Sequence, residues 1–520
     1  MNKTVVGALL IFILIVAGAL CVKFISPYIE DRQQRITSDA SKTKGTIRLD
    51  LDNWTGYYPL RSQEMKKMLR KSGYVLEVND DNADYAARMK RLENGDIDFA
   101  VATVDSYILN GVRENFPGTI VMVIDESKGG DAILSKKGMI DSLDKIKNLQ
   151  GVSVAFTPDS PSHHLAKAAA YHFGVKSLLP EGDAKIETDG SKAACDLLLD
   201  GRTDVAICWE PDVSRAIESG KVVKLLGTED TQKLIVDILL VNRRLASKKP
   251  ELVEMFIDSY FKILKIYRDN PDQLKKEVKQ ETGLSKTMVA SMLKGVSWVN
   301  FDANCRLWFG ISPAGGKSEE GLINTIESTV NILVNTGDFN ETPIPGKDPY
   351  RLTNSSFLKK LHAKNFAGFT KAGEPGNTSG DSLSASFSKL GKNQWAALKD
   401  VGTLKIEPVS FQRGTSDLDL LGKQVIDSMV AKLRHYPNFR IKINAHTGVR
   451  GDKKANRKLS QLRADAVDLY LKEKFSIDAN RTLATGYGGE KPLNRLQGES
   501  RRTWLYRLPR VGIALVKEVY

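Results

Sequence analysis

Cysteine is scarce in this sequence, with only four among 520 residues. Cys21 lies in an apolar run near the start, and Cys195, Cys208 and Cys305 are spread over the middle of the chain. This number and spacing exclude a disulfide framework and a cysteine-based metal site. Cys195 and Cys208 could pair in an oxidising compartment, but isolated buried thiols are the simpler expectation.

A stripe of charge of one sign is also missing. Lysine and arginine number 76 against 63 aspartates and glutamates, giving a formal net charge of +13, and acidic residues stand between the basic ones nearly everywhere. Nucleic-acid-binding proteins carry a basic stripe instead, so we expect no nucleic acid as a partner. A basic excess of this kind suits anionic neighbours such as wall polymer or lipid head groups. The length predicts two or three domains.

The sequence also lacks the motifs of enzymes and cofactor sites. It contains no phosphate-binding loop, no dinucleotide fingerprint and no HExxH zinc motif. His163 and His164 stand near Ser160 and Ser162, but no nucleophile elbow with a Ser–His–Asp order accompanies them. We therefore expect a protein that is not an enzyme and that has no catalytic residues, metal or cofactor.

One long hydrophobic run is present at 5–24, interrupted only by Lys23 and long enough to cross a bilayer as a helix. It predicts a single transmembrane helix as an anchor at 1–25, followed by a polar stalk at 26–44. A cleaved signal peptide is the rival, but its small-x-small cleavage site is missing. A lipidated Cys21 is disfavoured because Leu20 precedes it. The flanking charges leave the orientation open.

Between 45 and 365, strand-like and helix-like segments alternate, which is typical of an α/β fold with a parallel sheet. The segments 92–100 and 198–206 repeat one another, since in each a helix end is followed by glycine, aspartate and a buried strand. This repeat predicts two similar lobes with a cleft between them. A helical extension with core spacing follows at 248–293. The predicted strands are 46–51, 75–78, 99–103 and 120–125, and the predicted helices between them are 60–71 and 84–93.

Ligands of α/β sheets lie beyond the carboxyl ends of strands, next to helix N-termini. Hydroxyls and backbone N–H groups at 157–163 suit a carboxylate or sulfonate, whereas Asp105 and Glu210 suit an amine. A small anionic or zwitterionic solute is therefore the expected ligand. The predicted ligand-binding residues are Trp54, Tyr57, Thr103, Asp105, Thr157, Ser160, Ser162, His163, Trp209 and Glu210.

These residues also have purely structural interpretations. The two tryptophans could pack in the core or at a hinge. Ser160, Ser162 and Asp105 could each cap a helix. Glu210 could pair with a lysine at the cleft rim.

Four segments of the first half stand out in combination: Trp54-Thr-Gly-Tyr57-Tyr-Pro59, Gly130-Asp-Ala132-Ile-Leu, Val154-Ala-Phe-Thr157-Pro-Asp-Ser160-Pro-Ser162-His163 and Trp209-Glu-Pro211-Asp. With them, 46–307 resembles solute-binding proteins of the nitrate, sulfonate and taurine ABC-importer class. The resemblance implies a two-lobed periplasmic-binding-protein fold that closes over a small ligand, with Trp54 and Tyr57 on one side and Trp209 on the other. Some members of the wider fold group are enzymes, which leaves an enzyme as a remote alternative.

A linker rich in glycine and serine is predicted at 366–400, and a last domain at 401–520. The last domain has the pattern β-α-β-α-β-β, with strands at 404–406, 439–445, 481–485 and 511–516 and helices at 417–434 and 456–474.

Its diagnostic run is His446-Thr447-Gly448-Val-Arg-Gly451, then Asn456-Arg-Lys-Leu459-Ser460-Gln-Leu-Arg463-Ala464. With Gly486-Tyr487-Gly488 at matching spacing, 408–515 resembles the OmpA/MotB peptidoglycan-associated family.

This second resemblance implies binding to the diaminopimelate of the peptidoglycan stem, through an Asp after His-Thr and the Arg of the Leu-Ser-x-x-Arg-Ala run. The arginine is Arg463, but Gly448 stands at the Asp position. One charge-assisted contact of about 1.5–3 kcal/mol is therefore missing, unless Asp452 substitutes for it. A second departure is an apparent insertion around Trp504. The expected peptidoglycan-binding residues are His446, Thr447, Asp452, Asn456 and Arg463, with a retained scaffold or dimer interface as the alternative.

The leading prediction is a non-enzymatic solute receptor anchored in the inner membrane of a Gram-negative bacterium, with its bulk in the periplasm and its last domain on peptidoglycan. An ABC permease or a signalling protein is a candidate further partner. A structural envelope tether with a vestigial cleft is the alternative. A motor stator fits poorly, because 5–24 contains no Asp or Glu.

Overall fold

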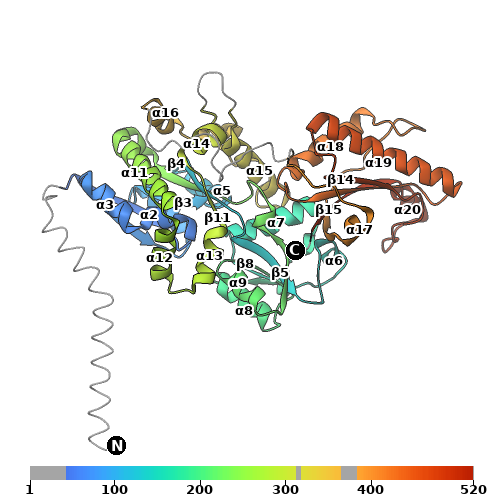
Figure 1. Ribbon diagram of the computed structural model, residues 1–520, viewed down its shortest axis with the longest axis horizontal. Helices are drawn as coiled ribbons and strands as arrows, with labels where there is room; N and C mark the ends of the chain where they lie inside the picture. Colours follow the sequence, from blue (N-terminus) through green and yellow to red (C-terminus); the bar gives the residue numbers. More distant parts are fainter. Residues whose placement is uncertain (1–42, 312–317, 365–382, 384, 519–520) are drawn as a thin grey trace, which may run out of the picture.

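The computed structural model describes residues 43–311, 318–364, 383 and 385–518 (Figure 1). The predicted membrane helix, the predicted stalk up to residue 42 and most of the predicted linker lie outside these residues. Across the described part, no helix combines the length and the apolar character that crossing a bilayer requires. Three sheets organise the chain, one in each of two lobes and one in a C-terminal domain.

The first lobe is built on a six-stranded sheet in the order β11-β4-β10-β3-β1-β2. Strands β1, β2 and β3 are parallel, as predicted, but β10 runs antiparallel between β3 and β4. The expectation of a parallel sheet is thus wrong for β10. The chain returns to this lobe from the second lobe, so β10 begins at the end of the sheet where β3 and β4 finish. The strands are β1 (Gly45–Leu51), β2 (Tyr74–Asp80), β3 (Phe99–Thr103), β4 (Gly118–Ser127), β10 (Val236–Asn242) and β11 (Val296–Trp298).

Helices cover both faces of this sheet, and local sequence sets their ends. The predicted helix 60–71 is split, because the Ser62 hydroxyl accepts a hydrogen bond from the backbone N–H of Met65 and starts a new helix there. In the core, the ring of Phe256 stacks on Phe99 at 4.1 Å. The helices are η1 (Thr55–Tyr57), α2 (Tyr58–Arg61), α3 (Gln63–Lys71), α4 (Tyr85–Asn94), α5 (Val104–Gly111), η2 (Val112–Glu114), α10 (Arg243–Lys248), α11 (Pro250–Asp269), α12 (Pro271–Thr282), α13 (Lys286–Lys294), α14 (Phe301–Ala303), η6 (Asn304–Trp308), α15 (Gly321–Asn335), η7 (Pro345–Lys347), η8 (Pro349–Leu352) and α16 (Ser356–Ala363).

The second lobe has a five-stranded sheet in the order β7-β6-β8-β5-β9, in which β5 is antiparallel to both neighbours. The repeat seen in the sequence is real in space: Gly95 ends α4 and Gly201 follows α8, both with positive φ, and each precedes a buried strand. The elements are β5 (Asp131–Lys136), α6 (Leu143–Ile146), β6 (Val154–Phe156), α7 (Pro161–Phe173), η3 (Lys176–Leu178), η4 (Gly182–Ala184), β7 (Lys185–Glu187), α8 (Ser191–Leu199), β8 (Val205–Trp209), α9 (Asp212–Glu218), β9 (Val222–Gly227) and η5 (Thr228–Asp230).

The chain passes between the lobes twice, from β4 to β5 and from β9 back to β10. The two crossing segments lie together, because the Thr228 hydroxyl oxygen accepts hydrogen bonds from the backbone N–H groups of Gly129 and Asp131 at 2.9 and 3.1 Å. Two α/β lobes joined by such a hinge confirm the predicted two-lobed fold.

The C-terminal domain is a four-stranded sheet in the order β12-β15-β13-β14 with two long helices against it. The predicted order of elements is confirmed, with two changes. The first strand ends at Thr403 instead of beginning at Leu404, and the residues around Trp504 form an additional short helix before the last strand. The elements are α17 (Lys392–Ala397), β12 (Lys399–Thr403), α18 (Leu420–Leu433), β13 (Arg440–His446), α19 (Lys453–Phe475), β14 (Thr482–Gly486), α20 (Arg501–Arg507) and β15 (Arg510–Lys517).

Part of the predicted linker belongs to this domain. Leu383 is fully buried, and the buried Arg481 donates a hydrogen bond to its carbonyl at 3.2 Å. Trp395 on α17 is buried beside Arg440, whose guanidinium lies 5.6 Å from the indole ring. The glycine- and serine-rich composition therefore extends the predicted linker too far toward the C-terminus.

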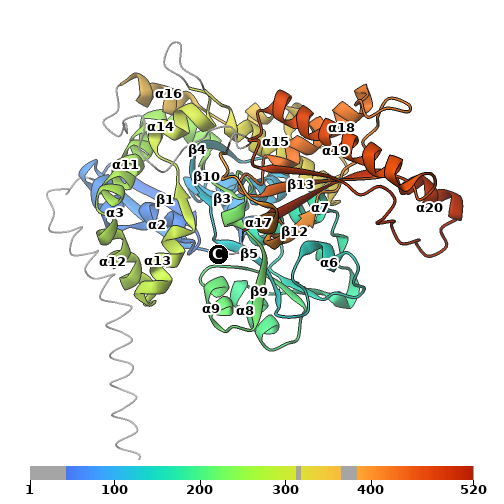
Figure 2. The same ribbon diagram turned by 45° about the vertical axis from the view of Figure 1, so that its right-hand side comes forward.

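The C-terminal domain is docked on the second lobe beside α7 and also lies next to α15 of the first lobe (Figures 1 and 2). One hydrophobic cluster runs through both, with Phe173 of α7 5.2 Å from the ring of Tyr436. The Tyr436 hydroxyl lies 2.8 Å from Nδ1 of His172, and Lys517 forms an ion pair with Asp230 at 2.6 Å. The domain therefore contacts both the second lobe and the chain segment that returns to the first lobe.

Candidate functional site

The cleft between the two lobes has a volume of about 1200 Å³ and is lined by residues from both. It lies where the sheets' strands end and the two hinge segments cross, which is where ligands of α/β folds bind. A groove of similar size, about 1230 Å³, lies between α15 and α18, but it separates the C-terminal domain from the lobes. The interlobe cleft is therefore the candidate solute site.

On the first lobe, Trp54 and Tyr57 line the cleft as the sequence predicts. The Trp54 indole N–H donates to the Asp125 carboxylate at 3.3 Å, and the Tyr57 hydroxyl donates to Asp237. Asp237 and Asp125 are directly opposite each other on β10 and β4. A pair of adjacent buried carboxyl groups thus underlies this wall of the cleft.

At the hinge, Asp131 is the first residue of β5 and is 4% exposed. Its carboxylate accepts hydrogen bonds from the Ser127 hydroxyl at 2.7 Å and from the Ser162 hydroxyl at 2.5 Å. Ser162 lies in the first turn of α7. The start of this helix, where the sequence predicts an anionic ligand, is therefore already linked to a carboxylate of the protein itself.

On the second lobe, Thr157, Ser160, Trp209 and Glu210 line the cleft. Ser160 caps α7, since its hydroxyl oxygen accepts from the backbone N–H of His163 at 3.2 Å. Glu210 accepts from both the backbone and the hydroxyl of Ser214, at 3.0 and 2.8 Å, instead of pairing with a lysine. The Thr157 hydroxyl is buried and has no hydrogen-bond partner among the described residues.

Three predicted ligand residues do not line the cleft. Ser162 reaches it only through Asp131, and His163 stacks on Phe156 at 4.2 Å with its ring nearly buried. Asp105 is buried in the first turn of α5. Thr103, by contrast, lines the cleft as predicted, together with the residues described in the paragraphs above.

Sequence reasoning missed the acidic residues that dominate the cleft. Asp131 stands inside a segment already singled out, and Asp52 directly follows a predicted strand, so position could have found both. Asp237 had no such signal, because its strand was not predicted to border the cleft. Asp52 is paired with the fully buried Arg88 at 3.2 Å, whereas Asp131 and Asp237 have no ion pair among the described residues.

Burial sets the charge state of these groups. It raises the pKa of Asp131 to about 6 and the pKa of Asp125 to about 7. Burial and the neighbouring Asp125 raise the pKa of Asp237 well above its usual value, and burial also raises the pKa of Glu210. The cleft thus holds carboxyl groups that are costly to ionise.

Among the described residues, the serine and histidine side chains at the start of α7 are not hydrogen-bonded to one another. The Ser160 hydroxyl donates to the Thr157 carbonyl, not to a histidine. Burial lowers the pKa of His163 to about 2 and that of His164 to about 3, so both rings are neutral at ordinary pH. Over the described residues, no cluster of His, Cys, Asp and Glu could hold a metal ion, and Cys195, Cys208 and Cys305 are free and buried.

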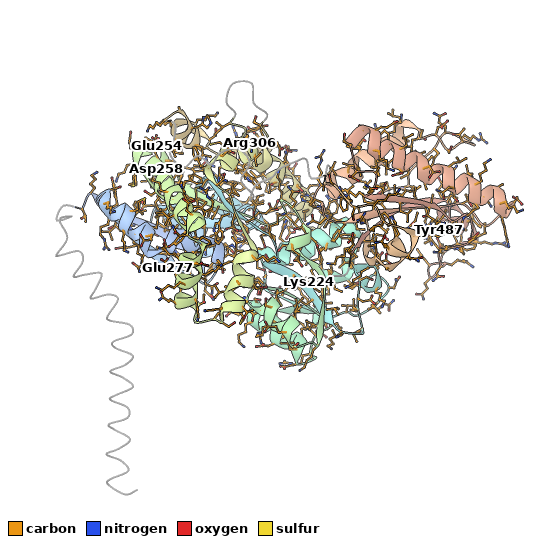
Figure 3. The ribbon with its side chains drawn as sticks, in the orientation of Figure 1. Lys224, Glu254, Asp258, Glu277, Arg306 and Tyr487 are labelled. Carbon is orange, nitrogen blue, oxygen red and sulfur yellow. The ribbon has the colours of Figure 1, made fainter. Side chains whose placement is uncertain are left out.

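In the C-terminal domain, the expected peptidoglycan-binding residues gather where β13 ends and α19 begins. His446 stacks on Tyr487 at 5.2 Å, and the backbone N–H of Thr447 donates to the Gly488 carbonyl at 2.9 Å. The Asn456 amide donates to the Arg450 carbonyl at 2.8 Å, which fixes the loop over α19. Tyr487, labelled in Figure 3, lies on the side of the domain away from the two lobes, and His446 and Thr447 beside it are themselves buried.

Arg463 continues the same face of α19, seven residues after Asn456. Its guanidinium lies 4.8 Å from the ring of Phe411 and makes only long hydrogen bonds, of 3.4 Å, to the Thr415 carbonyl. Among the described residues it has no acidic partner, and burial lowers its pKa. It is therefore a half-buried cation able to receive a carboxylate.

Asp452 does not replace the missing acid. Its carboxylate caps α19 by accepting from the backbone N–H of Ala455 at 2.7 Å. It precedes Arg463 by 11 residues, or about 16 Å along a helix axis. Gly448 is the vacant position instead, since a side chain there would meet no atom within 4 Å.

The C-terminal domain that contains Arg463 also matches a known protein family. Residues 410–503 match the model of the OmpA family. The chain is 32% identical over 85 residues to outer membrane protein Omp38 of Acinetobacter baumannii, covering 16% of this chain and 24% of that protein. It is 37% identical over 68 residues to the peptidoglycan-associated lipoprotein of Buchnera aphidicola subsp. Baizongia pistaciae, covering 13% and 39%. The predicted resemblance of the C-terminal domain to the OmpA family is confirmed.

The lobes resemble a different group. The chain is 25% identical over 204 residues to the taurine-binding periplasmic protein of Escherichia coli, covering 39% of this chain and 59% of that protein. The chain thus spans less than two thirds of each of these curated relatives. Among solved structures, the ligand-binding component of an ABC-type import system from Staphylococcus aureus has a TM-score of 0.46 at 17% identity, covering 61% and 99% of the two chains. The aliphatic sulphonate binding protein SsuA of E. coli has a TM-score of 0.44 at 17% identity, covering 57% and 89%.

Proposed function

We propose that this protein is a solute receptor of the bacterial envelope, held at peptidoglycan by its OmpA-family domain. The observation that carries the proposal is the interlobe cleft, where buried polar side chains from both lobes converge on a space large enough for a small organic molecule. The proposed ligand is small and anionic or zwitterionic, as the sequence predicts. A ligand of this kind has a precedent in the taurine-binding relative, by its name.

The proposed wall contact is Arg463, together with His446, Thr447 and Asn456 in the loop above it. The name of the peptidoglycan-associated relative supports this role for the domain. Charge supports it as well, since 401–520 contains 23 Lys and Arg against 12 Asp and Glu, most of the net excess of the chain. Such a domain is attracted to an anionic polymer.

The proposed location is the periplasm of a Gram-negative bacterium, with 5–24 as a single inner-membrane anchor. A receptor fixed at both the membrane and the wall diffuses little. It therefore suits sensing, or delivery to a fixed ABC permease or signalling partner, better than bulk transport.

One experiment tests both halves on the full chain in detergent. Thermal shift against small sulfonates, carboxylates, amino acids and amines should reveal a stabilising solute, since a ligand at 100 times its Kd adds about 2.7 kcal/mol. Trp209→Ala should abolish the shift. If no solute stabilises the protein while it still sediments with peptidoglycan, the cleft is vestigial and the protein is a tether.

The wall contact is tested by sedimentation with purified peptidoglycan. We expect Arg463→Ala to reduce binding at least tenfold, because a charge-assisted contact of about 1.5–3 kcal/mol is lost. Lys458→Ala is the matched control, since Lys458 is an exposed cation on the same helix, pointing well away from Arg463. An equal loss of peptidoglycan binding in both variants would show that the domain is held by general electrostatic attraction and not by a specific contact of Arg463.

A further inference from the structure

The charge of the interlobe cleft does not suit an anion. The basic side chains that line it are Arg61, Lys66 and Lys192, and carboxylates outnumber them. Arg61 is already bound to Glu281 at 3.0 Å, and Lys192 to Asp196 at 2.6 Å. The cleft therefore has an uncompensated excess of acidic groups.

Three of these carboxyl groups lie in the cleft without a cation. Asp131, Asp237 and Glu210 are 4%, 2% and 8% exposed, and none forms an ion pair with a described residue. Their hydrogen bonds come from neutral hydroxyl or backbone groups, such as Ser127 and Tyr57. A buried carboxylate is stable in its ionised form only with a cationic partner, and no described residue supplies one to this group.

Asp237 also has a second buried carboxyl group, that of Asp125, next to it. Asp125 faces it across the β4–β10 pair, is fully buried, and has one carboxylate oxygen with no hydrogen-bond partner among the described residues. Two adjacent acids of this kind repel one another when both are ionised, and a positive charge nearby would relieve that repulsion.

At the place predicted for an anionic ligand, two of the hydroxyl groups are already bound to groups of the protein. At the start of α7, the Ser160 hydroxyl caps the helix and the Ser162 hydroxyl is bound to Asp131. An anionic ligand seated there would lie against the Asp131 carboxylate, with the Thr157 hydroxyl as an unpartnered side-chain donor to set against that repulsion. The favourable field of the helix N-terminus acts instead on a charge that belongs to the protein.

The aromatic walls also favour a cation. Trp54 lines the cleft on the first lobe and Trp209 on the second. The indole N–H of Trp54 is committed to Asp125, so this residue offers the ligand its ring surface. Organic cations are stabilised by the faces of tryptophan rings.

We propose that the ligand of this cleft carries an organic cation, an ammonium group or its equivalent, held between Asp131 and Asp237 and bordered by Trp54, Trp209 and Glu210. This inference rests on the proposed receptor function and changes its ligand class: it selects zwitterions and organic cations over oxyanions and sulfonates that carry no ammonium group.

The test uses probes that share a carbon frame and differ in charge. Taurine is compared with isethionate, in which a hydroxyl replaces the ammonium, and putrescine is compared with succinate. Each is titrated into the full chain in detergent by calorimetry at pH 7.5. In at least one pair, the ammonium-bearing probe should bind at least tenfold more tightly than its match.

The variants separate recognition of charge from general damage. Asp131→Asn should reduce the preference within the binding pair at least fivefold. Asp212→Asn removes a charge of the same sign from the cleft rim, where Asp212 already pairs with Arg215 at 2.9 Å, and should leave the preference unchanged. Preferential binding of isethionate or succinate would overturn the cation assignment while leaving a solute receptor in place. Absence of binding by all four probes would contradict the cation assignment, and absence across the wider thermal-shift panel would contradict the receptor as well.

Discussion

At the scale of single residues, Asp131 is one of the buried carboxyl groups that make the stability of the protein depend on pH. Burial raises its pKa to about 6 in the folded protein, above the ordinary value of about 3.8 that applies when the chain is unfolded. At a pH between these two values, Asp131 is protonated in the folded state and ionised in the unfolded state. The contribution of Asp131 to stability therefore falls as the pH rises from about 4 to about 6.

Asp131→Asn should remove this dependence. Relative to the wild type, the variant should gain up to about 3 kcal/mol of unfolding free energy between pH 4 and pH 7.5, on top of a constant loss from an imperfect hydrogen bond. Other titrating groups near Asp131, such as Asp105 and Glu210, are present in both proteins, so their contributions to the stability difference largely cancel. Denaturant unfolding at a series of pH values measures the difference, and two parallel stability curves would contradict the argument.

Gly448 gives a second prediction at this scale. It stands where the OmpA/MotB resemblance places an aspartate, its φ is not positive, and a side chain there would have open space. Gly448→Asp should therefore fold without strain and strengthen peptidoglycan binding, by about 1.5–3 kcal/mol if the new carboxylate meets the stem's amine. Gly448→Asn controls for the added side chain, and an unchanged affinity in Gly448→Asp would show that this wall contact does not use an acid.

Strand ends and helix starts can be recognised from local patterns, so several of the predicted ligand-binding residues do line the interlobe cleft; that they bind a solute stays a prediction. Trp54, Thr157 and Trp209 line it as predicted. Sequence reasoning missed Asp237, whose position depends on a strand pairing between segments more than 100 residues apart. The capping role of Asp452 was equally hidden, since it depends on where α19 begins.

At the scale of elements, α17 shows why composition misplaces a boundary. The glycine and serine residues before it are typical of a linker, but Trp395 is only 8% exposed and packs with Leu398 and Val516. A single tryptophan that follows a polar stretch and precedes two alanines gives no clear periodic signal, so its burial could not be predicted from the sequence.

Trp395→Ala should consequently destabilise the OmpA-family domain by about 3 kcal/mol, as for other large buried side chains. Denaturant unfolding of the full chain measures this, and Trp395→Phe, which keeps an aromatic ring beside Arg440, should lose less. If Trp395→Ala unfolds like the wild type, then α17 contributes nothing to the domain.

At the scale of the whole molecule, the OmpA-family domain and the second lobe share one core. Gly402 approaches Phe173 and Leu143 so closely that a Cβ there would lie 2.9 and 3.2 Å from their side chains. The domain also contacts the returning hinge segment. There the backbone N–H of Gln232 donates to the His435 carbonyl at 2.9 Å, and Nδ1 of His435 lies 2.9 Å from the Gln232 carbonyl. Nε2 of His435 lies 2.7 Å from the hydroxyl of Ser328 on α15. Neither the docking nor its contact with the hinge could be predicted from local sequence patterns.

This interface should hold without a covalent connection. A protease site inserted near residue 375 and cleaved in the folded full chain should leave the two fragments together on size exclusion. Tyr436→Ala, which removes the ring against Phe173 and the partner of His172, should let them separate. Fragments that separate in the otherwise unchanged protein would show that the domain is only tethered.

The central claim is that the interlobe cleft holds a small organic solute, and native mass spectrometry of the full chain tests it most directly. The protein is released from detergent after incubation with millimolar mixtures of small amines, amino acids and sulfonates. We expect one additional mass per chain that disappears in Trp209→Ala and weakens in Asp131→Asn. A spectrum with only the mass of the protein, in every mixture, would contradict the receptor and leave a wall-bound tether.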